Sequence, residues 1–424
     1  MMSKNKVPQV RFKGFSEEWN SLGFDETFSN ISNNNLSRAE LNYEFGRGRN
    51  VHYGDILIRF SEILDVEKAI IPYITNDEYV NKFKNSKLQN GDIIIADAAE
   101  DETVGKCTEV VNIKDKIVFS GLHTIAVRPT KEFAPKYLGY YMNSSSYHNQ
   151  LLPLLQGTKV LSISKLAIKN TDIDFPKDKN EQTKIGDYFQ QLDKLIKQKE
   201  KKYQKLKQFK KAMLDKMFPK NGADTPEIRF KGFRGKWEEK RLEEIALIKT
   251  GYPFDSNKFD ANGEYLVITN GNIQNDFSFV DNLLGNKINI EDKCSLTEYI
   301  LNLNDILVTM DGTVGRVAKV IHEKQILAQR VGRIISLIDS DFVYYFLSTG
   351  DFFKKMKLIS TGGTIKHISL NDISKYESYI PKDFEEQKKI GDYFQKLDKQ
   401  IELQQKELEK LKNIKKASLA KMFV

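Results

Sequence analysis

One long stretch of this sequence occurs twice. The first copy, EQTKIGDYFQQLDKLIKQKEKKYQKLKQFKKAMLDKMF, covers residues 181–218, and the second, EQKKIGDYFQKLDKQIELQQKELEKLKNIKKASLAKMF, covers 386–423. The apolar residues that recur at steps of three, four and seven are Ile185, Phe189, Leu192, Ile196, Tyr203 and Leu206, matched by Ile390, Phe394, Leu397, Ile401, Leu408 and Leu411. This spacing predicts a long helix with a heptad seam in each copy. Because such a helix is not stable alone in water, we expect the two copies to pair.

The duplication extends beyond the two helical stretches. Residues 8–15 read PQVRFKGF and residues 226–233 read PEIRFKGF, and the tryptophans of the chain, Trp19 and Trp237, follow at the same distance. Two copies are too few for a solenoid and indicate a pseudo-two-fold molecule instead. The predicted parts are a globular domain at 1–177, a helix at 178–220, a second globular domain at 221–381 and a second helix at 382–424.

The connections predict how these parts are arranged. Pro219 stands where the first helix should end, and only residues 219–225 separate that end from the second repeat. The second domain must therefore begin near the far end of the first helix, and the second helix must run back along it. We expect an antiparallel pair, roughly 57 Å long at 1.5 Å per residue, with a globular domain at each end.

The globular parts mix two kinds of signal. Runs rich in Ile and Val at 55–58 and 93–95, bounded by Gly, Asn and Asp, predict strands. Residues 137–142 and 342–347 predict buried helix starts. The expected fold class is therefore α+β with a mainly antiparallel sheet, repeated in two similar domains.

Composition excludes several classes of protein. The hydrophobic content of 40% supports packed cores, and the absence of an 18-residue apolar run argues against a membrane span. The first residues, MMSKNKVPQV, contain no apolar signal core, so we expect a cytoplasmic protein. Cys107 and Cys294 are unrelated in motif, which predicts neither a disulfide framework nor a cysteine metal site. The net charge of +8 is concentrated in the helical stretches, as either a solvated coiled-coil face or a field that attracts a polyanion.

No motif for catalysis stands out. The sequence contains no GxxxxGK[ST] phosphate loop and no adjacent prolines, so the Asn/Asp-Pro-Pro-aromatic motif of amino-methyltransferases is absent too. The histidines show no metal-ligand spacing. Asp97, the acids at 100–102 and Lys106 resemble a nuclease cluster, but the matching stretch of the second repeat has only Asp311. A turn between strands explains both stretches better, and we predict no catalytic or metal residues.

Basic side chains in Gly- and Asn-rich stretches are the better candidates for a function. Arginine reads guanine bidentately, and Asn or Gln reads adenine, whereas small residues beside a Lys let the backbone approach a phosphate. The DNA-binding candidates are Arg38, Arg47, Arg49, Arg59 and Lys159 in the first domain and Arg316, Gln329, Arg330, Arg333 and Lys366 in the second. For each of them, an exposed basic side chain without a DNA contact is the alternative.

A glycine stands near the start of both predicted helices. Gly186 and Gly391 each cost about 1 kcal/mol relative to Ala within a helix. Their recurrence predicts the close approach of another backbone, such as a helix of a partner protein, with Tyr188 and Tyr393 beside them as further docking candidates. The alternative is a tolerated glycine near a frayed helix start.

These motifs together resemble those of the specificity (S) subunits of type I restriction–modification enzymes. The resemblance is carried by residues 226–233 with Trp237, by IPKDFEEQKKI at 380–390 and by Ile-Gly-Asp-Tyr-Phe in both helices, and it covers the whole chain. It implies two target-recognition domains, each reading one half of a split site in double-stranded DNA. It also implies a helical spacer that docks two methyltransferase subunits, to which motor–nuclease subunits are added.

The resemblance further implies a chain without a catalytic centre or a bound cofactor, because S-adenosylmethionine, ATP and Mg are expected in the partner subunits. Two other readings of the sequence remain open. The first is a DNA-modifying enzyme with unrecognised motifs, and the second is a coiled-coil scaffold without DNA contact. The bases recognised and the length of the gap between the half-sites are not readable from the sequence.

Overall fold

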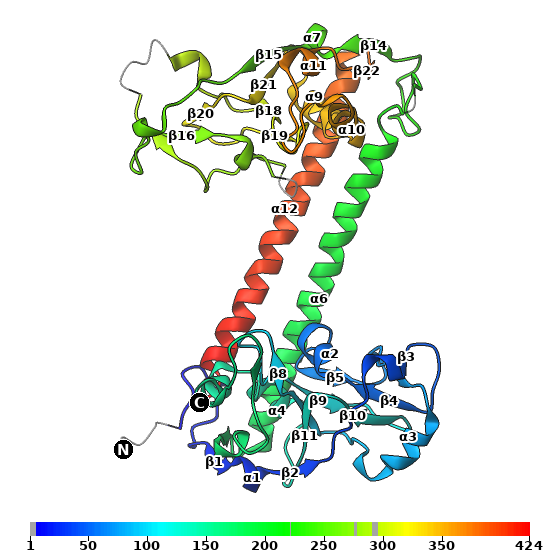
Figure 1. Cartoon of the computed structure of the whole chain (residues 1–424), viewed down its shortest axis with the longest axis vertical. Coiled ribbons are helices and arrows are strands. Elements are labelled where there is room, and N and C mark those ends of the chain that lie inside the picture. The colour runs from blue at the N-terminus through cyan, green and yellow to red at the C-terminus, as the bar shows by residue number, and fades with distance from the viewer. Residues whose placement is uncertain (1–5, 221, 275–277, 291–295) are drawn as a thin grey trace. The chain divides into compact units, whose positions relative to one another are not determined.

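The computed structural model describes residues 6–220, 222–274, 278–290 and 296–424 (Figure 1). The chain forms two compact units. Unit 1 comprises Met1–Glu200 and Lys406–Val424, and unit 2 comprises Lys201–Gln405. Each unit therefore contains one globular domain, the beginning of the long helix that follows it and the end of the other long helix.

The two long helices are α6 (Lys179–Lys216) and α12 (Phe384–Lys421), with 38 residues each, which confirms the helices predicted from the apolar repeat. An aspartate stands before each helix, and the Asp178 and Asp383 carboxylates accept hydrogen bonds from the free N–H groups of Asn180 and Glu385 at 2.8 Å. In unit 1, Tyr188 bonds Ser418. In unit 2, Lys210 pairs with Asp398.

The helix pairs run antiparallel within each unit. In unit 1, Lys199 pairs with Glu407, and in unit 2, Tyr203 bonds Gln405 at 3.4 Å. Together with the Tyr188–Ser418 and Lys210–Asp398 contacts, these pairs show that residue numbers on α12 fall as those on α6 rise. The antiparallel pairing expected from the connections is therefore found in both units.

Unit 1 contains a five-stranded and a four-stranded sheet. The order in the larger one is β2-β11-β7-β9-β5, and in the smaller one β10-β4-β6-β3. Their strands are β2 (Phe28–Ile31), β3 (Leu41–Asn42), β4 (Gly48–Val51), β5 (Ile63–Asp65), β6 (Tyr73–Ile74), β7 (Ile93–Ala96), β9 (Cys107–Val111), β10 (Ile117–Ser120) and β11 (Thr124–Pro129). Two short pairs are added, β1 (Asn20–Gly23) with β13 (Asp172–Phe175) and β8 (Ala98–Ala99) with β12 (Leu161–Ser162). Only β4·β10 and β5·β9 are parallel among these pairs.

The short helices of unit 1 are α1 (Phe24–Thr27), α2 (Tyr53–Ile58), α3 (Asp77–Lys82), α4 (Tyr137–Tyr141) and α5 (Ser145–Leu151). The strand predicted at 55–58 is wrong, because these residues lie in α2. The His52 ring accepts a hydrogen bond from the N–H of Gly54 and caps this helix, and Asp55 stands in its first turn. A short apolar run does not distinguish a strand from a buried helix turn, so these polar residues decided the outcome.

Unit 2 repeats this plan. Its four-stranded sheet has the order β15-β21-β18-β19 and its three-stranded sheet the order β17-β16-β20, with only β16·β20 parallel among their pairs. The strands are β14 (Glu238–Arg241), β15 (Ala246–Thr250), β16 (Tyr265–Ile268), β17 (Lys287–Ile288), β18 (Ile306–Thr309), β19 (Val317–Lys319), β20 (Gln325–Leu327), β21 (Val331–Ser336) and β22 (Glu377–Ile380), where β14 pairs with β22. The helices are α7 (Leu242–Ile245), α9 (Ser340–Leu347), α10 (Gly350–Ile359) and α11 (Leu370–Ser374). The predicted α+β class with mainly antiparallel pairing is confirmed.

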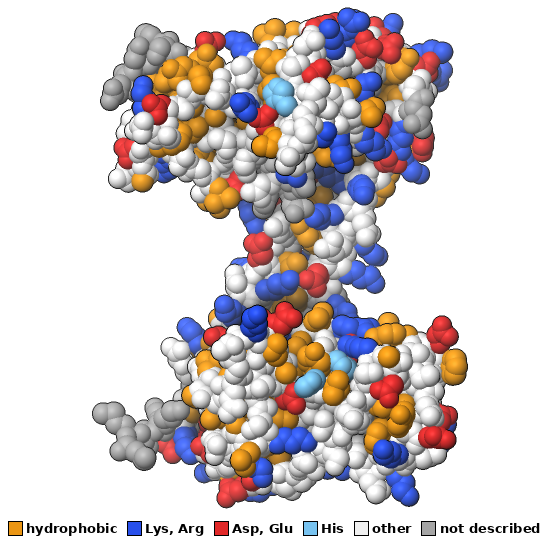
Figure 2. All heavy atoms as spheres, viewed as in Figure 1, with side chains coloured by type: hydrophobic (Ala, Val, Ile, Leu, Met, Phe, Trp, Pro, Cys, Tyr) orange, Lys and Arg blue, Asp and Glu red, His pale blue; other side chains and the backbone are white. Residues whose placement is uncertain are grey.

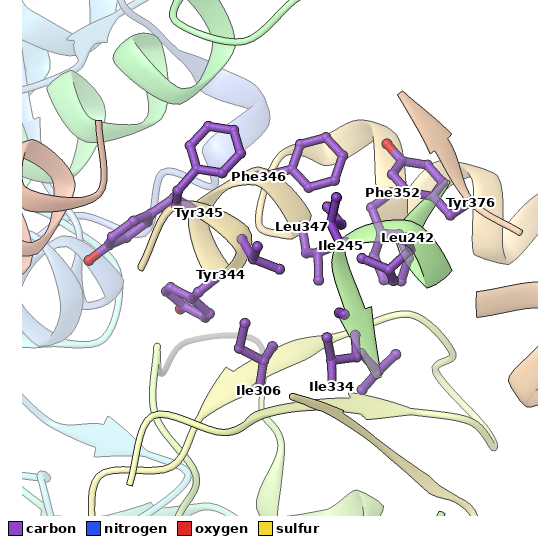
Figure 3. Packing of buried hydrophobic residues seen from close by; sticks show 14 of the residues in the cluster. Leu242, Ile245, Ile306, Ile334, Tyr344, Tyr345, Phe346, Leu347, Phe352 and Tyr376 are labelled. Atoms are coloured by element: carbon purple, nitrogen blue, oxygen red, sulfur yellow. The ribbon is translucent and has the colours of Figure 1, made fainter. Parts of the chain in front are cut away.

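The largest core of each unit joins the sheet to the long helices. In unit 2 the aromatic face of α9 packs over Ile306 and Ile334 of the sheet (Figure 3). Phe394 of α12 and Phe218, which follows α6, complete this core. The start of one helix and the end of the other therefore both lie inside the domain core, and unit 1 repeats this arrangement with Phe189 and Phe423.

The repeated PxxRFKGF segments fasten these helix ends. Arg11 binds the buried carboxylate of Glu181 through two hydrogen bonds of 2.7 and 2.8 Å, and Arg229 binds Glu386 at the same distances. In unit 1 the N–H of Val10 also donates to the carbonyl of Lys421 at 2.9 Å. The segment therefore ties the end of one long helix to the start of the other. Within the described residues, no helix is long and apolar enough to span a membrane.

Candidate nucleic-acid interface

Two of the predicted arginines of unit 1 meet on one buried carboxylate. Asp55, which is fully buried, accepts a hydrogen bond from Arg38 at 2.9 Å and pairs with Arg59 at 3.4 Å. Arg59 also donates to the hydroxyl of Tyr43 at 2.5 Å and lies over its ring. Because the side chains of Arg38 and Arg59 are still 45% and 39% exposed, Asp55 holds two positive groups in fixed positions at the surface.

The other two arginines of this stretch lie elsewhere. Arg49 donates to the carbonyl of Val66 at 3.2 Å and to the hydroxyl of Tyr73 at 3.1 Å, and its guanidinium lies over the Tyr73 ring. Much of its hydrogen-bonding capacity is therefore used inside the protein. Arg47 is exposed on the segment before β4. Contact of either residue with DNA stays a prediction.

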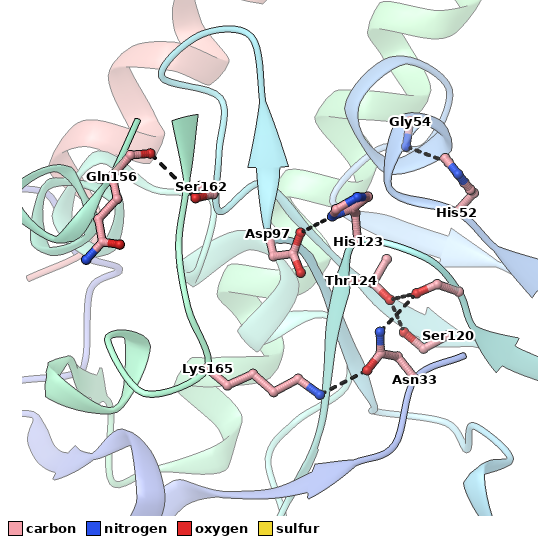
Figure 4. A network of polar contacts seen from close by, with 11 residues as sticks. Asn33, His52, Gly54, Asp97, Ser120, His123, Thr124, Gln156, Ser162 and Lys165 are labelled. Atoms are coloured by element: carbon pink, nitrogen blue, oxygen red, sulfur yellow. Dashed lines mark hydrogen bonds and ion pairs between the residues drawn. The ribbon is translucent and has the colours of Figure 1, made fainter. Parts of the chain in front are cut away.

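A histidine that the sequence reasoning did not select lies against Tyr53 of α2. His123 directly precedes β11 in the left-handed backbone region, with φ of 52°, and its Nδ1 lies 3.3 Å from Asp97 Oδ1 (Figure 4). The Tyr53 ring meets the His123 ring edge-on at 5.2 Å and lies tilted against the His52 ring at 4.6 Å. Burial raises the pKa of the Asp97 carboxyl, whereas burial, followed by the charge of Arg38, lowers the pKa of His52.

A tight glycine loop adjoins Asp97. Gln156 and Ser162 lie opposite each other (Figure 4), and their backbones exchange two hydrogen bonds of 2.8 and 2.9 Å. The N–H of Ile163 donates to the Asp97 carbonyl at 2.8 Å. Gly157 has φ of 110°, and a Cβ there would lie 2.0 Å from a carbonyl oxygen, so only glycine fits. The predicted Lys159 is exposed on this loop.

Unit 2 carries the same construction with different side chains. Arg330 directly precedes β21 with φ of 68°, and its Nη1 lies 3.0 Å from Asp311 Oδ2. The His367 ring bonds the same carboxylate. Burial works to raise the pKa of Asp311, but the hydrogen bonds from His367 and Arg330 outweigh it and lower that pKa. Asp311 therefore stays ionised and orients both side chains.

The glycine loop is also repeated. A Cβ on Gly362, whose φ is 98°, would lie 2.3 Å from the carbonyl oxygen of Ile365. The predicted Lys366 is exposed, its Nζ donates to the Gly362 carbonyl at 3.0 Å, and its own carbonyl accepts the N–H of Gly312. The structure thus brings Lys366 and Arg330 to the same acid-centred site.

The remaining candidates of unit 2 differ in exposure. Gln329 is exposed next to Arg330, and Arg316 is half-buried in the turn between β18 and β19. The selection of Arg333 as a DNA-binding candidate requires a correction. It is only 4% exposed, lies 2.6 Å from the Asp305 carboxylate and donates to the carbonyls of Glu298 and Ile300. Arg333 lies within strand β21 and not in a loop, and its side chain is buried against Asp305 instead of being exposed at the surface.

The helix glycines also require a correction. A Cβ on Gly186 would lie 3.0 Å from the Pro135 carbonyl oxygen, and a Cβ on Gly391 would lie 2.7 Å from the Asp339 carboxylate and 3.0 Å from the Phe342 nitrogen. Another backbone does approach both glycines, as predicted. It belongs to the segments that begin α4 and α9 of this same chain, so both glycines are buried and do not face a partner protein.

The two tyrosines beside these glycines are partly buried. Tyr188 meets the ring of Phe12 edge-on at 6.0 Å, and Tyr393 meets Phe230 at 5.7 Å. These rings therefore hold the PxxRFKGF segments against the long helices. Whether they also touch a partner subunit stays a prediction.

The acids that were weighed as a nuclease cluster have structural roles. Asp97 is bonded to His123, and Asp101 accepts hydrogen bonds from the N–H and hydroxyl of Thr103, as the turn interpretation predicted. Among the described residues, no three His, Cys, Asp or Glu side chains lie close enough to hold a metal ion. On the visible face of each unit, basic side chains alternate with acidic and apolar ones and form no continuous basic patch (Figure 2).

The residues that were missed share one sequence signal. In both repeats an acid follows the buried strand before the TVGK or TVGR turn, Asp97 in the first and Asp311 in the second. The residue before the last strand of the sheet, His123 or Arg330, is its partner. Only Arg330 was selected, because histidine was weighed as a metal ligand and not as a DNA contact.

Comparisons with known proteins agree with this architecture. The family model described as type I restriction modification DNA specificity domain matches residues 50–208 and 234–413. The type I restriction enzyme MjaVIII specificity subunit of Methanocaldococcus jannaschii is 28% identical over 282 residues, which cover 62% of this chain and 63% of that subunit, less than two thirds of its length. The putative MjaX specificity subunit of the same organism is 25% identical over 360 residues, 81% of each chain.

Two solved structures share the fold. The S subunit of a type I restriction–modification system from M. genitalium superimposes with a TM-score of 0.61 over 99% of both chains at 16% identity. A chain from a study of complex assembly and conformational transition of the type I R-M system gives a TM-score of 0.55 at 16% identity, over 95% of this chain and 96% of that one. Because the family model matches both repeats and most of the sequence, the chain belongs to the family of type I restriction–modification specificity (S) subunits.

Proposed function

We propose that unit 1 and unit 2 each read one half of a bipartite site in double-stranded DNA. The observation that carries this proposal is the repeated surface construction, in which a carboxylate holds a half-exposed His or Arg beside a glycine loop with an exposed Lys. Arginine and histidine can hydrogen-bond base edges, and lysine on a tight loop can meet a phosphate. Two such surfaces on one chain suit a target that has two parts.

The long helices then act as the spacer between the two half-sites and as the docking surface for two methyltransferase subunits, which motor–nuclease subunits join. S-adenosylmethionine, ATP and Mg belong to those partners in this proposal, and the present chain supplies recognition alone. The buried Gly186 and Gly391 are not part of the docking surface.

A domain exchange tests the division of the target. Residues 21–176 are replaced by the equivalent domain of a related S subunit, and the chimera is produced with its methyltransferase. Mapping of methylated adenines in the host genome is expected to show one changed half-site and one unchanged half-site. A chimera that alters both halves would contradict the proposal.

A helix extension tests the spacer. Seven residues inserted after both Ile196 and Ile401 keep the apolar seam nearly in register and lengthen each helix by about 10 Å. The two half-sequences are expected to persist while the gap widens by about three base pairs at 3.4 Å each. Full modification at the original gap would show that the helices do not set it.

A further inference from the structure

We propose that His123 and Arg330 occupy one reading slot that is repeated in the two units, and that the side chain in this slot selects one base of each half-site. The reading slot consists of this residue, its acid partner and the adjacent glycine loop: His123, Asp97 and residues 156–162 in unit 1, and Arg330, Asp311 and residues 361–367 in unit 2. The inference rests on the proposed function, since it assigns one base contact within each half-site.

The backbone that carries the reading residue is equivalent in the two slots, although the acid stands one position later along the chain in unit 2. The His123 carbonyl accepts the N–H of Asp97 at 3.2 Å, and the Arg330 carbonyl accepts the N–H of Met310 at 3.3 Å. The next residue in each case opens the last strand of the main sheet, with Thr124 opposite Ala96 and Val331 opposite Thr309. The chain therefore places different side chains at one and the same position of a rigid sheet.

The conformation is one that glycine adopts more easily. A left-handed backbone is unfavourable for an ordinary L-residue, yet both slots hold a large side chain there. That side chain is 52% exposed for His123 and 66% exposed for Arg330, while the acids behind them are only 25% and 15% exposed. Each acid thus orients its partner from the protein side and leaves the outer edge of the side chain open.

The acid also determines which hydrogen-bond donors or acceptors remain on the exposed edge of the His123 or Arg330 side chain. When Asp97 is ionised it only accepts hydrogen bonds, so His123 Nδ1 is then the donor in this pair. In the neutral ring Nε2 is then an acceptor, which suits the amino group of adenine or cytosine in the major groove. Arg330 uses Nη1 on Asp311 and keeps further N–H groups for the two acceptors of guanine.

The residues around His123 and Arg330 favour a base contact over a purely structural role for these two side chains. In unit 1 the Tyr53 ring meets His123, and Tyr53 opens α2, the helix that carries Asp55 with its partners Arg38 and Arg59. In unit 2, Gln329 precedes Arg330, and Lys366 lies on the loop tied to Asp311 through His367 and Gly312. Each slot is therefore bordered by groups suited to phosphate and base contact.

The test exchanges the slot residues in the full-length chain assembled with its methyltransferase subunits. The complexes are incubated with a duplex library in which both half-sites are randomised, and the bound duplexes are sequenced. His123→Arg should introduce a guanine preference at one position of the unit 1 half-site, roughly ten-fold or more over the other bases. Arg330→His should remove a guanine preference at one position of the unit 2 half-site by a similar factor.

Two further pairs of variants serve as controls. Lys159→Ala and Lys366→Ala should weaken binding to all sequences alike without changing any base preference. Each should also reduce the slope of the logarithm of the binding constant against the logarithm of salt concentration by about one. If an exchanged chain does not assemble, His123→Asn and Arg330→Asn replace it, because Asn tolerates the left-handed region. These variants should relax the same single positions.

Unchanged base preferences in the exchanged chains and the Asn variants, with binding retained, would overturn the assignment of the slot. A change at several positions or in both half-sites would overturn it too. The proposed function fails in a different way, because the wild-type complex would then select no split motif at all. A split motif that ignores the slot residues therefore refutes only the present inference.

Discussion

Replacement of Phe423 by Ala should destabilise unit 1 strongly, although this residue lies only one position from the end of the sequence. The Phe423 ring is 4% exposed and stacks on Phe189 with centroids 5.6 Å apart. It also meets Trp19, Tyr137 and Tyr141 edge-on at 5.7–6.3 Å. A residue beyond a frayed helix end contributes almost nothing to stability, so this position separates a core role from a frayed end of α12.

The expected loss follows from these contacts. Truncation of a buried Phe to Ala costs about 3–5 kcal/mol, and each aromatic pair adds about 0.5–1.5 kcal/mol beyond area burial. Since Phe423 has four ring partners and leaves a cavity between the sheet domain and α6, we expect about 4 kcal/mol. Leu195→Ala, which truncates a side chain on α6 that is 47% exposed, should cost less than about 1 kcal/mol.

Tryptophan emission can report each unit separately. In a Trp237→Phe background, Trp19 lies next to Phe423 and its emission in urea follows unit 1. In a Trp19→Phe background, Trp237 lies next to Phe218, so Phe218→Ala is the matched variant for unit 2. A loss below about 1 kcal/mol for Phe423→Ala in the first background would refute the placement of the helix end in the core.

Two further predictions concern buried groups. Gly391→Ala should destabilise unit 2 by about 1–2 kcal/mol, since overpacking against the start of α9 outweighs the gain of about 1 kcal/mol in helix propensity. Gly186→Ala should change the free energy of unfolding very little, because the new Cβ would lie 3.0 Å from its nearest neighbour, a looser fit than at Gly391. Equal effects of the two substitutions in urea unfolding would contradict this expectation. Burial raises the pKa of Glu109 from its ordinary 4.5 to about 7, despite hydrogen bonds from two N–H groups. Between pH 4.5 and about 7 the folded chain keeps a proton that the unfolded chain has released, so unit 1 should lose about 3 kcal/mol of stability as pH rises through this window. Glu109→Gln should remove this pH dependence of the free energy of unfolding. An identical pH dependence in both proteins would exclude Glu109 as its source.

Tertiary structure determined which of the singled-out residues face solvent. Arg333 and Arg330 stand three positions apart and carry the same charge, yet one is buried against Asp305 and the other is exposed on Asp311. Arg330 directly precedes β21, whereas Arg333 lies inside this strand, where successive side chains point to opposite faces. Neither difference is visible when residues are only counted as loop-like. The same holds for Gly391, whose neighbour was expected to be a partner protein and is the start of α9.

The long helices, their antiparallel pairing and the internal duplication were predictable from the sequence, because the apolar repeat, the linker at 219–225 and the matching motifs are local patterns along the chain. Which acid holds His123, which core receives Phe423 and which backbone covers Gly186 depend on residues far apart in sequence. Such contacts arise only when the sheet, the short helices and both long helices pack together, so the tertiary structure alone decided them.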